Sequence, residues 1–113
     1  MNYIKNITAE KALVLEDQVN YSEGQIVSRT LAQNKAVSLT LFAFWQGEEI
    51  STHESTGDAL ITILDGEAEI TIDGKIHTLK KGESILMPAD IPHAVKAITN
   101  QKMMLTVVFP AEI

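Results

Sequence analysis

The chain has 113 residues and a mass of 12.4 kDa, which suits one domain spanning residues 1–113 and leaves no room for two of ordinary size. Its 15 acidic and 9 basic residues give a formal net charge of -6, so neither nucleic acid nor an anionic membrane surface is expected as a partner. The sequence contains no cysteine, which excludes disulfides, cysteine-ligated metals and cysteine nucleophiles.

The first 24 residues are expected to form an N-terminal arm that precedes a barrel in residues 25–113. Within the arm, Ala9–Gln18 follows Thr8, a residue type that caps helices, and this segment is interpreted either as a helix or as extended chain. The apolar run Ala12–Leu15 is too short for the core of a signal peptide or for a membrane span. By default, we expect a cytoplasmic protein.

From residue 25 onward, apolar residues recur with a period of two, which is typical of β-strands. The clearest alternation lies in residues 68–72, where alanine and isoleucine alternate with glutamate and threonine. Strands are expected at residues 25–31, 37–45, 59–64, 68–72, 83–87, 93–98 and 103–109.

Two Asp-Gly pairs, Asp65-Gly66 and Asp73-Gly74, separate the strands in the middle of the chain. An Asp-Gly pair between alternating apolar runs is a strong hairpin signal, so residues 59–79 are predicted to form a meander. Pro88 and Pro92 place a loop between the strands that flank them. About eight short strands with frequent turns predict an all-β sandwich or barrel.

The chain has three histidines, and two of them lie where a strand meets an open end. His53 and His93 could be brought together by a barrel, and imidazole is a common ligand for zinc, iron, nickel and copper. His53 and Ser55 would point the same way on a strand. His77 is interpreted as an exposed or half-buried strand residue.

Two sets of residues in this region carry a family resemblance. The first set is Gly47, His53 and Gly66, and the second is Gly82, Pro88 and His93. With these residues at these spacings, the chain resembles a small single-domain cupin of the cupin 2 conserved barrel type. The strand pattern extends the resemblance to Phe109. The second motif departs from the family at Asp90, which replaces a glycine, and at Ala97, which replaces an asparagine.

The resemblance implies a jelly-roll, or double-stranded β-helix, barrel whose open end holds a divalent metal bound by three histidines and a glutamate. In this chain Ser55 stands where the family has its second histidine, and Ala59 stands where it has the glutamate. Two of the four implied ligands, His53 and His93, therefore remain for an ion such as Zn, Ni, Mn or Fe.

A third ligand is needed for a firmly held ion, because catalytic zinc normally has three protein ligands. Asp58 is the best candidate, although on a continuous strand it would face away from Ala59 unless the turn at residues 55–57 changes the alternation. Glu49 lies too far along the strand, and Glu54 would face the wrong way. The alternative is that His53 and His93 hydrogen-bond to each other, to Ser55 or to water, without a metal.

Without the glutamate, the barrel mouth would have room for a small, partly apolar ligand. The pocket is predicted to include His53, Ser55, Ala59, His93, Phe44 and Met87. Further apolar lining could come from Phe42, Trp45, Ile61, Ile63, Met103 and Leu105. Ser55 lacks a convincing acid to orient a neighbouring histidine, so it makes a weak case for acyl transfer.

Three functions follow from these observations, and the sequence leaves all three open. The first is binding of a small molecule in the barrel mouth, with a weakly held divalent metal or none. The second is a metal-dependent enzyme of isomerase, decarboxylase or dioxygenase type. The third is a structural or interaction role as a homodimer, which the resemblance implies and to which exposed Leu60, Leu64 and Ile76 could contribute.

Overall fold

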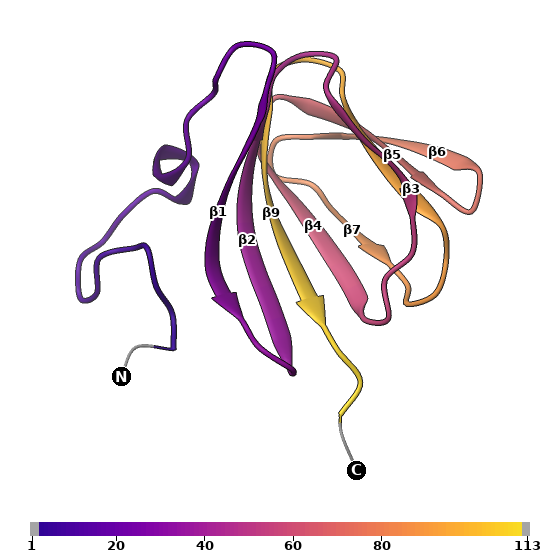
Figure 1. The fold of residues 1–113 in the computed structure, drawn as a ribbon. Helices are drawn as coiled ribbons and strands as arrows, with labels where there is room; N and C mark the ends of the chain where they lie inside the picture. The colour runs from indigo at the N-terminus through magenta and orange to yellow at the C-terminus, as the bar shows by residue number, and fades with distance from the viewer. Residues whose placement is uncertain (1–2, 112–113) are drawn as a thin grey trace.

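The computed structural model describes residues 3–111, and these are organised almost entirely as β-structure (Figure 1). The described residues contain nine strands and one short 3-10 helix. In chain order the elements are η1 (Leu15–Gln18), β1 (Ile26–Gln33), β2 (Val37–Phe44), β3 (Glu49–His53), β4 (Asp58–Asp65), β5 (Glu67–Ile72), β6 (Lys75–Lys80), β7 (Ser84–Met87), β8 (His93–Ala97) and β9 (Gln101–Val108).

The strands form two sheets that face each other. The five-stranded sheet has the order β1-β2-β9-β4-β7, and the four-stranded sheet has the order β3-β8-β5-β6. Every pair of neighbouring strands is antiparallel. Figure 1 shows β3, β5 and β6 lying across from β4 and β7, so the two sheets close into a flattened barrel. The all-β, jelly-roll prediction is confirmed.

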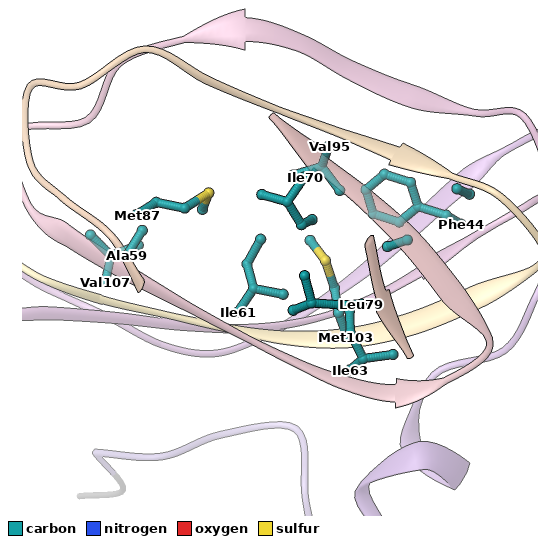
Figure 2. Packing of buried hydrophobic residues seen from close by; sticks show 12 residues of the cluster. Phe44, Ala59, Ile61, Ile63, Ile70, Leu79, Met87, Val95, Met103 and Val107 are labelled. Atoms are coloured by element: carbon teal, nitrogen blue, oxygen red, sulfur yellow. The ribbon is translucent and has the colours of Figure 1, made fainter. Parts of the chain in front are cut away.

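The hydrophobic core lies between the sheets because alternate strand residues point inward. On β4, Ile61 and Ile63 are almost completely buried, and on β5, Ile70 meets them from the opposite sheet (Figure 2). Burying one such side chain contributes roughly 1.5–3 kcal/mol to folding, before conformational entropy is subtracted. The same alternation that predicted the strands therefore supplies the inner face of each sheet.

Residues 3–24, the described part of the predicted N-terminal arm, cover the outer face of the five-stranded sheet. Val19 of the arm packs with Leu31 of β1 and Leu41 of β2 in a second buried cluster. The alternatives for Ala9–Gln18 are both partly right, because only Leu15–Gln18 is helical, as a single 3-10 turn without a side-chain cap. The boundary between arm and barrel stays a prediction.

The predicted meander is wrong in its first half. β4 and β5 lie in different sheets, and only Gly66 separates them, so the Asp65-Gly66 pair turns a corner between layers. Asp73-Gly74 does join a hairpin, β5 to β6, and both of its residues have positive φ, 49° and 77°. Positive φ at both central residues is the geometry of the tight turn that this dipeptide favours.

β3 was not expected as a separate strand, because its five residues are mostly polar and exposed. It pairs with β8 at the edge of the four-stranded sheet. Of the apolar residues expected on open faces, Leu60 and Ile76 are exposed, whereas Leu64 is partly buried because the cluster under the arm includes it. Among residues 3–111, no helix is long and apolar enough to cross a membrane.

Candidate functional site

His53 and His93 come together because they lie directly opposite each other on paired strands. His53 ends β3, His93 begins β8, and the register of the two strands pairs them with each other. Side chains of directly opposed residues on antiparallel strands lie on the same face, with Cβ atoms roughly 5 Å apart. The pairing of β3 with β8 therefore brings together two histidines that are forty positions apart in the sequence.

The two imidazole rings contact each other edge to face. Their centroids are 4.3 Å apart with an angle of 73° between the planes, and the two Nε2 atoms are 3.1 Å apart. The Nδ1 of His53 lies 2.9 Å from the carbonyl oxygen of Ser51, and the Nδ1 of His93 lies 3.1 Å from that of Ile91. Because a carbonyl oxygen only accepts hydrogen bonds, each Nδ1 is the donor.

The two histidines differ in burial. His93 is 3% exposed, whereas His53 lies at the rim and is exposed. Burial lowers the pKa of His93, the charge of His53 lowers it further, and the hydrogen bond to Ile91 opposes both effects. The inner ring is therefore the one that resists protonation.

A cavity of about 450 Å³ opens beside the histidine pair, between the two sheets. Its walls are mostly apolar side chains from β4, β7, β8 and β9, with polar groups from the segment after β3. The lining residues are Ile50, His53, Glu54, Ser55, Thr56, Ala59, Ile61, Met87, His93, Val95, Met103, Leu105 and Val107. An apolar chamber with a few polar groups at one side is the usual form of a small-molecule site.

Five of the six residues predicted for the pocket line this cavity, and Phe44 does not. Phe44 pairs with Gln101 at the start of β9, whereas Val107, which lines the cavity, lies near the end of that strand. Figure 2 shows Phe44 at the opposite end of the core from Ala59 and Val107. Strand parity correctly placed Phe44 inside the barrel, but it could not say at which end.

The predicted third ligand, Asp58, points away from the cavity. Its neighbour Ala59 is 2% exposed and faces inward, so the alternation of β4 turns Asp58 outward. The Asp58 Oδ1 atom accepts a hydrogen bond of 2.8 Å from the backbone N–H of Ala89. It joins the start of β4 to the loop after β7, so the structure does not bring Asp58 together with the two histidines.

Ser55 lines the cavity, and its hydroxyl oxygen accepts a hydrogen bond of 3.2 Å from the N–H of Gly57. This contact stabilises the turn between β3 and β4. Glu54, which was expected to face away, also lines the cavity. The apolar residues Ile50, Val95 and Val107 were not named from the sequence, although Val107 shares the inward parity of Met103 and Leu105 on β9.

The donor set does not fit a resident divalent metal. Catalytic zinc sites normally have three protein ligands, and non-haem iron sites have two histidines and a carboxylate. Within residues 3–111, no group of three or more His, Asp or Glu side chains could hold an ion. The histidine pair supplies two nitrogen donors, and we assign no metal to it.

The sequence matches the model of the cupin domain family over residues 40–109. Among solved structures, it is similar to a conserved protein of unknown function from Streptococcus pyogenes, with 45% identity and a TM-score of 0.97 over 99% of this chain and 98% of that one. A cupin superfamily protein from Desulfitobacterium hafniense has 34% identity and a TM-score of 0.91, covering 95% and 98% of the two chains. No curated protein matches the sequence.

A third similar structure belongs to a larger protein. It is a cupin 2 conserved barrel domain protein from Leptotrichia buccalis, with 47% identity and a TM-score of 0.80. The alignment covers 82% of this chain and 45% of that one. The likeness therefore extends over most of the present chain.

Proposed function

The chain belongs to the cupin domain family, and from that premise we propose that it binds a small molecule in the cavity beside His53 and His93. The ligand has a largely apolar body and one polar group. The apolar body packs between the two sheets, and the polar group contacts the histidine pair. No chemical step is assigned to the site.

The observation that carries this proposal is the cavity itself. Its volume of about 450 Å³ falls within the roughly 300–1,000 Å³ of small-molecule sites, and a single water-filled defect would be far smaller. Ala59 contributes to that volume, because a larger residue at this inward position of β4 would project into it.

The other two functions have less support. A metal-dependent isomerase, decarboxylase or dioxygenase needs a third ligand, and within the described residues the donor set falls short of three. A homodimer is compatible with ligand binding and stays a prediction, which sedimentation of the purified protein would test. Ligand binding explains the cavity and, unlike the metal-dependent enzyme, needs no further ligand residue in the site.

The test is a screen of a fragment library by ligand-observed NMR, with the wild-type protein and the variant Ala59→Leu. We expect several apolar fragments to bind the wild type and to lose binding in the variant, because the added side chain occupies the cavity. Leu60→Phe is the matched control, since it enlarges the next residue of β4 on the exposed face.

The outcome of this screen decides the proposal. Binding that survives Ala59→Leu but is lost in Leu60→Phe would place the ligand on the outer face of the sheet and contradict it. The absence of any binder in the wild type would contradict it as well. Both variants should first be shown to unfold cooperatively, so that a loss of binding is not a loss of fold.

A further inference from the structure

We propose that Asp58 is a positioning residue for the ligand site, and that its carboxylate holds in place the loop that must move for a ligand to enter the cavity. This loop, residues 54–57, joins β3 to β4 and is here called the mouth loop. Its residues Glu54, Ser55 and Thr56 line the cavity. The proposal rests on the proposed function and concerns how the same site opens.

The mouth loop lies outside both sheets. β3 ends at His53 and β4 begins at Asp58, so the residues between them belong to none of the described strands. At the β4 end of the loop, Gly57 lies against β9, where an added Cβ would come within 2.5 Å of the Val108 carbonyl oxygen. A segment outside the strand ladders opens at a lower free-energy cost than the strands beside it. The contacts that anchor this loop therefore decide how often it moves.

Two hydrogen bonds anchor the mouth loop and the start of β4 to the loop after β7, residues 88–92. The N–H of Asp90 donates to the Ser55 carbonyl oxygen at 2.8 Å, and the N–H of Ala89 donates to Asp58 Oδ1 at 2.8 Å. In the first bond both groups belong to the backbone. The second bond ends on a carboxylate, which makes it stronger than a hydrogen bond between neutral groups. Asp58 is therefore the anchor that a side-chain substitution can remove.

The loop after β7 is the rigid partner in this contact. Pro88 and Pro92 fix the backbone φ at its two ends, and the Asp73 N–H donates to the Pro92 carbonyl oxygen at 2.9 Å. Asp90 has a φ of 63°, a left-handed conformation that aspartate adopts only where the surrounding structure holds it. Because this loop is held at both ends, the cavity opens by movement of the mouth loop away from it.

Asp58 acts through the mouth loop and not by contact with the ligand, since its side chain faces away from the cavity and bonds to Ala89. Loss of that bond should raise the fraction of time for which the mouth loop is open. More frequent opening gives any small reagent faster access to the cavity walls, whether or not a ligand is known. Access can therefore be measured directly.

The experiment measures access with a single cysteine inside the cavity. The sequence contains no cysteine, so Met103→Cys gives one thiol to follow. Met103 lines the cavity, is 1% exposed, and lies away from Ala59 and Val107 toward the middle of the core (Figure 2). The probe is methyl methanethiosulfonate, a small uncharged reagent, and mass spectrometry gives the labelling rate. We expect the folded protein to be labelled at least about tenfold more slowly than the same chain in urea, because the loop restricts access.

In this background, Asp58→Ala should raise the labelling rate at least about fivefold, because it removes the bond to the Ala89 N–H. Asp58→Asn keeps an oxygen acceptor at the same position, so its rate should stay within about twofold of the parent. Thr62→Val is the matched control. It removes the hydrogen bond of 2.9 Å to Ser84 at the end of the β4–β7 pairing away from the mouth loop, and should leave the rate unchanged.

Denaturation curves of every variant give the population of the globally unfolded chain, whose contribution to labelling is subtracted. Any of four results would overturn the inference. They are labelling of the folded parent as fast as the chain in urea, equal rates in the parent and Asp58→Ala, an acceleration that the unfolded population explains, and an equal acceleration in Asp58→Asn or Thr62→Val.

These results are separate from the test of the proposed function. Fragments that bind the wild type and lose binding in Ala59→Leu would still support a ligand site, even where the labelling rates show that Asp58 does not control access to it. If no fragment binds the wild type, the proposed function fails and this inference fails with it, whatever the labelling rates are.

Discussion

Gln101 is a polar residue inside an apolar layer. Its side chain is completely buried on β9, and neither amide atom has a hydrogen-bond partner among the described residues. Each buried polar group without a partner costs roughly 1–3 kcal/mol. The residue lies at the end of β9 that pairs with Phe44, away from the cavity.

We predict that Gln101→Met stabilises the protein. Methionine has a similar unbranched shape and no amide to bury, so the free energy of unfolding should rise by about 1 kcal/mol. Chemical denaturation measures the change. Gln33→Met, at an exposed position of β1, is the control and should have little effect. A loss of stability in Gln101→Met would mean that the amide has a partner in solution.

His93 should make folding stability depend on pH. Its pKa in the folded protein lies below the ordinary value of 6.5, so between these two values the unfolded chain binds more protons. Stability therefore falls as the pH drops below about 6.5 and continues to fall until His93 is protonated in the folded state as well. The cause is the burial of the ring beside His53.

Denaturation curves across this pH range test the prediction. The wild type should lose stability toward acid more steeply than His93→Gln, in which the titrating ring is absent. His77→Gln should keep the wild-type slope, because it leaves the buried His93 and its neighbours unchanged. Identical slopes for the wild type and His93→Gln would contradict the assignment.

At the scale of elements, the two Asp-Gly pairs have the same local sequence and different roles. Gly66, with φ +71°, lies against the turn between β8 and β9, where a Cβ would overlap the Asn100 carbonyl and come within 2.7 Å of Thr99 Oγ1. Gly74, with φ +77°, has no described atom within 4 Å of such a Cβ. The corner at Gly66 packs against Thr99 and Asn100, whereas the hairpin turn at Gly74 has open space around it.

Alanine substitutions should therefore have unequal costs. Gly74→Ala meets only backbone strain and should lower the free energy of unfolding by about 1 kcal/mol. Gly66→Ala adds a steric overlap with backbone and should cost at least about 2 kcal/mol. Thermal or chemical denaturation of both variants gives the comparison. Equal losses would show that the corner can shift to make room.

The arm is held to the barrel by polar contacts as well as by Val19. The Tyr21 hydroxyl donates to Asp65 Oδ2 at 2.5 Å, and the Lys102 ammonium lies 4.9 Å from the centre of the Tyr21 ring. Burial and the contact with Asp65 raise the pKa of Tyr21, so it remains a donor at neutral pH. The arm thereby covers a sheet face that would otherwise be open.

At the scale of the whole molecule, the barrel brings together the four positions for which the cupin resemblance implied metal ligands. His53, Ser55, Ala59 and His93 all line one cavity. Two of these four positions lack ligand side chains, which is why the present donor set falls short. A histidine at position 55 and a glutamate at position 59 would therefore face the same cavity as His53 and His93.

We predict that the double variant Ser55→His/Ala59→Glu gains a metal site. Four ligands facing one cavity should bind zinc or nickel at least about tenfold more tightly than the wild type. Calorimetry with EDTA-treated, untagged protein measures the affinity. In the control Ser55→His/Leu60→Glu, the carboxylate lies on the exposed face of β4 and should add little. Equal affinities in the two double variants would contradict the geometry.

The sequence by itself determined the class of fold and the residues that could do chemistry. Alternation with a period of two encodes which side chains face inward, and this holds for a strand such as β5 whatever its partner. The spacing of glycines, Pro88 and histidines predicted that His53 and His93 would share a site. These signals are local, or depend on a family pattern, so they can be read along the chain.

Only the tertiary structure decided how the elements are combined. Asp65-Gly66 is a corner and Asp73-Gly74 a hairpin because the choice depends on which sheet each strand joins, which no dipeptide encodes. Phe44 lies away from the cavity because its place along the barrel depends on pairing with β9. His53 and His93, forty positions apart in the sequence, meet because the register of β3 on β8 places them opposite each other, and that register exists only after folding.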